Sequence, residues 1–171
     1  MKVDRYLLRS GASVSREICS LLFVIVRRVM PRVLVVDDHA VIRRGVQGIL
    51  SNYPEWDLCG EADNGQDGIR LAGELAPEVV IMDVSMPGMN GLEATRIIHD
   101  VLPETKVLLL TLHSSSEFVR SAFRAGARGY VLKSDAENEL VRALNVVIGE
   151  GTYVSPAIDA CAVKESIFYN N

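Results

Sequence analysis

The chain contains 171 residues, of which 49% are hydrophobic and 23% are charged, a composition that indicates a folded globular protein and not a disordered one. Its net charge of −4 is unevenly distributed, because residues 1–30 carry six Lys or Arg against two Asp or Glu, and residues 31–171 carry 12 against 20. The excess of acidic residues over 31–171 argues against a nucleic-acid-binding protein, since phosphate contacts need clustered basic side chains. The three cysteines stand far apart and in no metal-binding spacing, which favours free thiols and a cytoplasmic location.

Residues 1–30 do not resemble the rest of the chain. Their apolar run, residues 18–26, is followed by Arg27-Arg28 and is too short for a membrane span, which needs about 20 residues. No small-residue cleavage site of a signal peptide follows this run. We therefore interpret residues 1–30 as a non-essential extension or the product of a mis-assigned start, and favour this over a membrane-contacting amphipathic helix.

From residue 31 onward, strand and helix patterns alternate five times. Short continuous apolar runs are typical of strands buried on both faces, and apolar residues at i, i+4, i+7 and i+8 are typical of amphipathic helices. We predict strands over 33–36, 56–62, 79–83, 106–111 and 129–133, and helices over 40–51, 64–75, 90–102, 114–125 and 135–148. This alternation predicts parallel βαβ units in a doubly wound α/β fold with a five-stranded sheet. Residues 151–171 lack strong periodicity and are predicted to form a tail or linker, with a short helix over 157–167 as the alternative.

Polar side chains stand at the ends of four predicted strands. Asp37 and Asp38 follow the first strand, Asp83 ends the third, Thr111 the fourth and Lys133 the fifth. Because the carboxyl ends of parallel strands share one edge of the sheet, we expect these side chains to meet there. Three carboxylates in one place repel one another unless a cation neutralises them, and oxygen ligands of this kind suit Mg²⁺. A hydroxyl and an ammonium nearby would stabilise an arriving anion, which favours phosphoryl transfer onto a carboxylate.

The order and spacing of these motifs resemble a response-regulator receiver domain of bacterial two-component signalling, over about residues 31–150. The matching motifs are the Asp-Asp pair after the first strand, Asp83 with the Met-Pro-Gly-Met-Asn-Gly turn over 86–91, Thr111, and the Gly-Tyr-Val-Leu-Lys run over 129–133. Residues 124–130 and 151–156 are further similar to the NarL/FixJ subfamily. The resemblance implies a flavodoxin-like (βα)5 fold with strand order 2-1-3-4-5, and a phosphorelay switch that is not a turnover enzyme.

The resemblance also implies roles for individual residues. Asp83 would accept a phosphoryl group from a sensor histidine kinase and become an aspartyl phosphate. Mg²⁺ would be held by Asp38, Asp83 and the backbone carbonyl of Ser85, with Asp37 contributing through water. The structural alternatives are that Asp37 and Asp38 only cap a helix and that Asp83 only caps the following turn.

Three further residues would carry the response to phosphorylation. Thr111 would bond the phosphoryl oxygen, Lys133 would pair with the phosphoryl group, and Tyr130 would swing inward on activation. The alternative for Tyr130 is an ordinary semi-buried tyrosine. The face formed by residues 114–148 would then change, and it could form a homodimer or dock a partner.

Two histidines lie near the predicted site. Ser85 and His113 occupy loop positions where they are expected to set the lifetime of the phosphoryl group by steering water. A metal-ligand role is not favoured for His39 or His113, because the carboxylates suffice for Mg²⁺.

Two alternatives stay open. NarL/FixJ-like regulators normally carry a helix-turn-helix domain after such a linker, and residues 151–171 are too few to encode one. We therefore expect no DNA binding by this chain as it stands, and a fragment of a transcriptional regulator is an alternative. The other alternative is a phosphohydrolase of the haloacid-dehalogenase type, but its nucleophile ends the first strand in an Asp-x-Asp pattern, whereas here the two aspartates are adjacent.

Overall fold

The structure is a computed structural model that describes residues 30–158. The predictions for residues 1–29 and for the helix beyond residue 158 lie outside this range. Within it, the elements are β1 (Arg32–Val36), α2 (Ala40–Leu50), β2 (Asp57–Ala62), α3 (Gly65–Leu75), β3 (Val79–Met82), α4 (Gly91–Val101), β4 (Lys106–Thr111), α5 (Ser116–Arg124), β5 (Gly129–Leu132), the 3₁₀ turn η1 (Lys133–Asp135), α6 (Ala136–Ile148) and β6 (Tyr153–Val154). Among these residues no helix is both long and apolar enough to cross a membrane.

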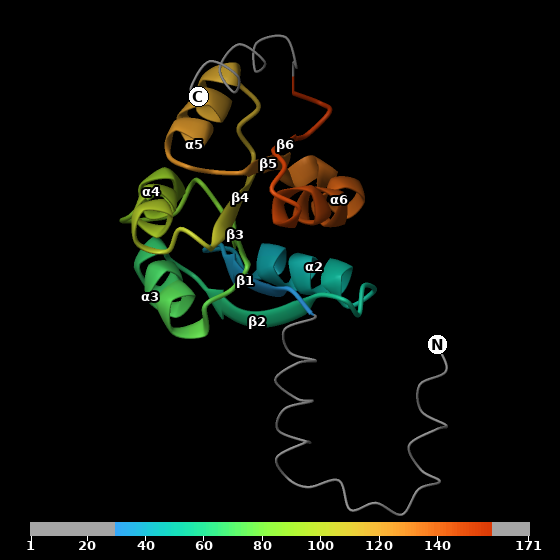
Figure 1. Cartoon of the computed structure of the whole chain (residues 1–171). Helices are drawn as coiled ribbons and strands as arrows, with labels where there is room; N and C mark the ends of the chain where they lie inside the picture. The colour runs from blue at the N-terminus through green and yellow to red at the C-terminus, as the bar shows by residue number, and fades with distance from the viewer. Residues whose placement is uncertain (1–29, 159–171) are drawn as a thin grey trace, which may run out of the picture. The chain divides into compact units, whose positions relative to one another are not determined.

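The strands form one parallel sheet with the order β2-β1-β3-β4-β5-β6 (Figure 1). The doubly wound α/β fold and the order of its first five strands confirm the prediction. Helices α3, α4 and α5 pack against one face of the sheet, and α2 and α6 pack against the other. The reversal of strand order lies between β1 and β3, which is where ligands bind in sheets of this kind.

The central strands β1, β3, β4 and β5 are mostly apolar without alternation because both faces of the sheet are covered there. All four residues of β3 and all four of β5 are buried. In β1, Leu34 and Val36 contribute to the core under α3, α4 and α5, whereas Val33 and Val35 contribute to the core under α2 and α6. One strand thus supplies two cores, which is typical of a buried parallel sheet.

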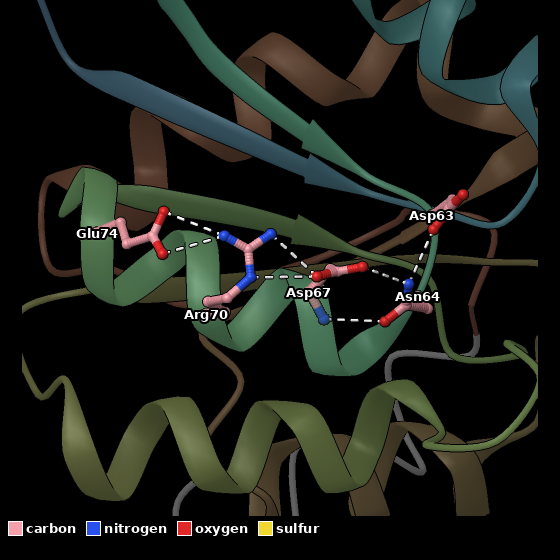
Figure 2. Close-up of polar contacts among 5 residues, drawn as sticks. All are labelled: Asp63, Asn64, Asp67, Arg70 and Glu74. Carbon is pink, nitrogen blue, oxygen red and sulfur yellow. Dashed lines mark hydrogen bonds and ion pairs between the residues drawn. The ribbon is translucent and has the colours of Figure 1, made fainter.

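Short polar residues begin the helices on the α3–α5 face. The Asn64 side chain accepts a hydrogen bond from the Asp67 amide, and the Asn90 side chain accepts one from the Glu93 amide, as expected of N-caps. Figure 2 shows the first of these caps together with Arg70, which pairs with Asp67 and Glu74 along the exposed side of α3. At α5 the cap is Ser115, so this helix begins two residues later than predicted.

The sixth strand was not predicted from the sequence. Residues 151–158 were expected to belong to a tail or linker, but Tyr153 and Val154 pair in parallel with Gly129 and Tyr130 of β5. Tyr153 is 8% exposed and Ile158 is 3% exposed, so this segment belongs to the core. The prediction failed here because a two-residue strand has no periodicity to detect.

Gly91 lets the start of α4 approach the backbone at the end of β3. A Cβ atom at this position would lie 1.9 Å from the carbonyl oxygen of Asp83, and the Gly91 amide donates to the carbonyl of Val84 at 2.9 Å. Because the obstructing atom belongs to the backbone, it cannot rotate away, and any side chain would push the loop after β3 out of place.

We expect Gly91→Ala to lower the free energy of unfolding by about 1–3 kcal/mol, the usual cost of forcing extra atoms into a packed site. Urea unfolding would measure the change. The matched control is Gly73→Ala in the interior of α3, where a Cβ meets nothing within 4 Å. This variant should gain about 0.5–1 kcal/mol from the better helix propensity of alanine. Equal stability changes in both variants would contradict the steric role of Gly91.

Candidate functional site

The carboxyl ends of β1, β3 and β5 bring three charged side chains together. The Asp83 amide donates to the carbonyl of Val36 at 2.8 Å, which joins the end of β3 to the end of β1. Lys133 directly follows β5, and its ammonium nitrogen lies 2.7 Å from Asp37 Oδ2 and 3.1 Å from Asp83 Oδ2. The three side chains are only 8%, 4% and 3% exposed, respectively. Of the five strand-end side chains predicted to meet, the structure brings together Asp37, Asp83 and Lys133 here and adds Asp38 beside them.

The cluster still carries an excess of negative charge. Asp37, Asp38, His39 and Asp83 each offer a ligand atom, and these atoms all lie within 4.8 Å of one another. Three carboxylates against one ammonium leave a formal charge of −2, which a divalent cation would cancel. Hard oxygen ligands suit Mg²⁺, whereas an imidazole suits transition metals better. The donor set therefore fits Mg²⁺ held by the carboxylates, with Asp38 the most exposed of the three at 25%.

His39 lies beside the carboxylates, in the neighbourhood that the sequence predicted. Its Nδ1 atom is 2.7 Å from Asp38 Oδ1 and 3.3 Å from Asp37 Oδ1, and its backbone amide donates to Asp37 Oδ1 at 2.9 Å. The ring is 62% exposed, so solvent reaches this side of the cluster. His39 begins α2 as its N-cap residue without a side-chain cap, which leaves the imidazole free to face the carboxylates.

Arg43 is a supporting residue that the sequence reasoning missed. Its Nη1 atom donates to the backbone carbonyl of Asp37 at 2.7 Å, and its Nε atom pairs with Glu61 at 3.0 Å. The guanidinium thereby ties the end of β1 to β2 and α2. The available signal was its place on the first turns of α2, one helical turn after His39, where it can reach back to the strand end.

His113 joins several residues of the predicted site. Its Nε2 atom lies 2.9 Å from the Ser85 hydroxyl, and its ring stacks on Phe118 with centroids 4.0 Å apart and an interplanar angle of 9°. Its backbone amide donates to the buried hydroxyl of Thr111 at 3.2 Å. His113 therefore connects the loop after β3, the end of β4 and the start of α5.

Tyr130 is fully buried and its hydroxyl donates to the backbone carbonyl of His113 at 2.8 Å. Burial raises the pKa of Tyr130 to about 12, and the nearby Thr111 hydroxyl partly opposes this shift. Tyr130 therefore points inward in this structure, and its movement on activation stays a prediction. The backbone of His113 holds Thr111 on one side and Tyr130 on the other.

A second group of carboxylates shows the contrast with an ordinary surface network. Asp67 and Glu74 are about half exposed and pair with Arg70, while Asp63 accepts a hydrogen bond from Asn64 (Figure 2). Each of these carboxylates has a partner and access to water, so none needs a cation. Only the cluster at Asp37 and Asp83 combines burial with excess negative charge among residues 30–158.

Comparison with known proteins gave consistent matches. The family described as "Response regulator receiver domain" matches residues 33–145. The chain is 42% identical over 129 residues to "Response regulator GacA" of Pseudomonas aeruginosa. The aligned region covers 75% of this chain and 60% of that relative. It is 34% identical over 134 residues to "Transcriptional regulatory protein DegU" of Brevibacillus brevis, covering 78% of this chain and 57% of the relative. The chain therefore spans less than two thirds of the length of these relatives.

A solved structure resembles this chain in both fold and sequence. The crystal structure of a two-component response regulator of the LuxR family from Aurantimonas sp. SI85-9A1 superposes with a TM-score of 0.72 and 34% sequence identity. The match covers 81% of this chain and 95% of that one. The described fold is thus shared along nearly the whole length of that structure.

The buried phenol of Tyr130 gives a prediction for alkaline pH. Its folded-state pKa of about 12 lies above the ordinary value near 10, so the folded state holds the phenolic proton more tightly than the unfolded chain does. This contribution to stability is fully present below about pH 10 and is lost as the pH rises to about 12.

In an ultraviolet titration of tyrosinate, Tyr130→Phe should remove one phenol that ionises near pH 12. Tyr153→Phe is the matched control, because burial and a hydrogen bond to Glu139 raise the pKa of Tyr153 to about 12 as well. If Tyr130→Phe instead removed a phenol that titrates near the ordinary value, the inward position of Tyr130 would be wrong.

Proposed function

This chain belongs to the response regulator receiver domain family, and we propose that it accepts a phosphoryl group on Asp83 from a sensor histidine kinase in the presence of Mg²⁺. Receiver domains act as signalling switches and not as turnover enzymes. Membership of this family also removes the haloacid-dehalogenase alternative, whose nucleophile would end the first strand and not the third.

The observation that carries the proposal is the buried ion pair between Lys133 and Asp83, next to Asp37 and Asp38. Asp83 is 3% exposed yet borders a partly open cluster, so its carboxylate is shielded from bulk water and still reachable through the side of Asp38 and His39. A carboxylate in such a place is a usable nucleophile, and a fixed ammonium beside it stabilises added negative charge.

The proposed transfer uses these groups in defined ways. One carboxylate oxygen of Asp83 forms a bond to phosphorus while the P–N bond to the kinase histidine breaks, and the electron pair leaves with the imidazole, which takes up a proton. Mg²⁺, when bound by Asp38 and Asp83 with the Ser85 carbonyl and with Asp37 through water, would neutralise the phosphoryl oxygens. Lys133 stays paired with the cluster and offsets the charge that arrives on Asp83. Thr111 would donate its hydroxyl to a phosphoryl oxygen.

The switch would act through Thr111, His113 and Tyr130. Because Tyr130 is already buried and bonded to His113, phosphorylation would stabilise this arrangement relative to others and would not need to create it. Any change would reach α5, β5 and α6, since Phe118 of α5 stacks on His113 and Tyr130 belongs to β5. This face is the proposed site for a homodimer or a protein partner, in a cytoplasmic signalling protein.

The direct test of the acceptor is the intact mass of the full chain after incubation with acetyl phosphate and Mg²⁺. We expect the wild-type chain to gain one phosphoryl group and Asp83→Asn to gain none. Asp63→Asn is the matched control, because Asp63 also follows a strand but lies in the exposed network of Figure 2. An adduct on Asp83→Asn, or none on the wild type despite Mg²⁺ binding, would overturn the proposal.

His113 should set the lifetime of the phosphoryl group. The imidazole bonds Ser85 and stacks on Phe118, so it covers the loop beside Asp83 and restricts the approach of water. We expect His113→Ala to speed dephosphorylation by about tenfold, which corresponds to about 1.4 kcal/mol of barrier. The decay of the adduct mass after removal of acetyl phosphate gives the rate. His99→Ala on α4 is the control with the same substitution outside the site, and an unchanged rate in His113→Ala would exclude this role.

A further inference from the structure

The C-terminal segment 151–158 is held against β5 by a specific set of hydrogen bonds. The Tyr153 amide donates to the carbonyl of Arg128 at 3.0 Å, and the Ser155 amide donates to the carbonyl of Tyr130 at 2.9 Å. Tyr153 also hydrogen-bonds Glu139 of α6 through its hydroxyl. The segment is therefore fixed to both β5 and α6, next to the residues of the proposed switch.

The hydroxyl of Ser155 takes the place of a backbone acceptor at the end of the hydrogen-bond ladder between β5 and β6. The carbonyl of Tyr130 bonds Ser155, so the backbone groups of Tyr130, and of Leu132 two residues later, point towards β6. In a continued parallel ladder the Leu132 amide would bond the Ser155 carbonyl, but that carbonyl accepts the Ile158 amide at 3.0 Å. The Ser155 hydroxyl accepts the Leu132 amide instead, at 3.1 Å.

This hydroxyl is well placed to influence Lys133. Ser155 is 1% exposed and Leu132 is 7% exposed, so water does not replace the bond when the hydroxyl is removed. Leu132 is the last residue of β5, and Lys133 begins the 3₁₀ turn that directs its ammonium to Asp37 and Asp83. The hydrogen bond of the Leu132 amide therefore holds the backbone in place directly before Lys133.

We propose that Ser155 is a positioning residue for the phosphoryl-accepting site, which holds Leu132 so that the Lys133 ammonium stays on Asp83. The proposal rests on the function proposed above for Asp83 and Lys133. Ser155 touches no reacting atom and acts through the backbone of Leu132. Its own position is set independently, by the Ile158 amide on its carbonyl and the Tyr130 carbonyl on its amide.

The test compares Ser155→Ala with Thr105→Val in the full chain. Both variants lose a buried hydroxyl hydrogen bond. The Thr105 hydroxyl donates to the carbonyl of Pro77 at 2.9 Å, and it lies just before β4, at the amino ends of the strands and away from the site. Ser155→Ala should lower the rate constant of phosphorylation by acetyl phosphate by about tenfold, as expected of a small misplacement at a reacting centre. Thr105→Val should leave this rate within about twofold of the wild type, and Ser155→Thr, which keeps the hydroxyl, should restore most of the rate.

Two NMR measurements separate positioning from general stability. Hydrogen exchange at the Leu132 amide should speed up in Ser155→Ala while the β4 amides stay protected, and the Nζ resonance of Lys133 should shift. Neither change should occur in Thr105→Val. If Ser155→Ala does not fold, Ser155→Cys keeps the shape with a weaker acceptor and should show the same changes to a smaller extent.

The possible outcomes are distinct. Equal phosphorylation rates in the wild type and Ser155→Ala, or an unchanged Lys133 resonance, would overturn the positioning role. Equal losses of rate in Ser155→Ala and Thr105→Val would also overturn it, because both would then reflect stability. If the wild type takes up no phosphoryl group, the proposed function fails, and the Lys133 resonance still decides whether Ser155 positions the lysine.

Discussion

The site depends on the contacts of one ammonium with two carboxylates, Lys133 with Asp37 and Asp83. Burying an ion in a protein costs several kcal/mol unless a partner of opposite charge and good geometry compensates. Here all three groups are less than a tenth exposed, so each needs the others. Because the residues come from the ends of three different strands, the contacts are possible only when β1, β3 and β5 end at the same edge of the sheet. The parallel register is therefore a condition for the chemistry as well as for the core.

Contacts with backbone groups hold these strand ends in place. The Asp83 amide bonds the end of β1, Arg43 bonds the carbonyl of Asp37, and Gly91 allows α4 to pack onto the carbonyl of Asp83. Ser155 adds a comparable contact at the end of β5. None of these contacts involves a carboxylate of the acidic cluster, yet each limits how far a charged side chain in it can move. Preorganisation of this kind places charges without reorganisation when an anion arrives.

His113 connects the loop that follows Asp83 to α5 and β5. Its side chain contacts Ser85 and Phe118, and its backbone contacts Thr111 and Tyr130. A change at Asp83 that moved Thr111 would therefore reach α5 through the ring and β5 through the phenol. The surface network of Asp63, Asp67, Arg70 and Glu74 differs in its exposure to solvent, because its side chains pair on the outer side of α3, where water screens their charges (Figure 2).

The alternation of strands and helices and the helix caps at Asn64 and Asn90 could be predicted from local patterns, because apolar periodicity and capping act over a few neighbouring residues. The residue types at the strand ends are likewise visible in the sequence. The order of the strands followed from the resemblance of these motifs to a known family. Other features became visible only in the folded chain: Tyr130 is buried and bonded to His113, the His39 imidazole faces the carboxylates, and Tyr153 and Val154 form a sixth strand. The bond between Ser155 and Leu132 joins residues 23 positions apart and belongs to no periodic pattern. Such contacts depend on how distant segments pack, and no local feature of the sequence encodes that packing.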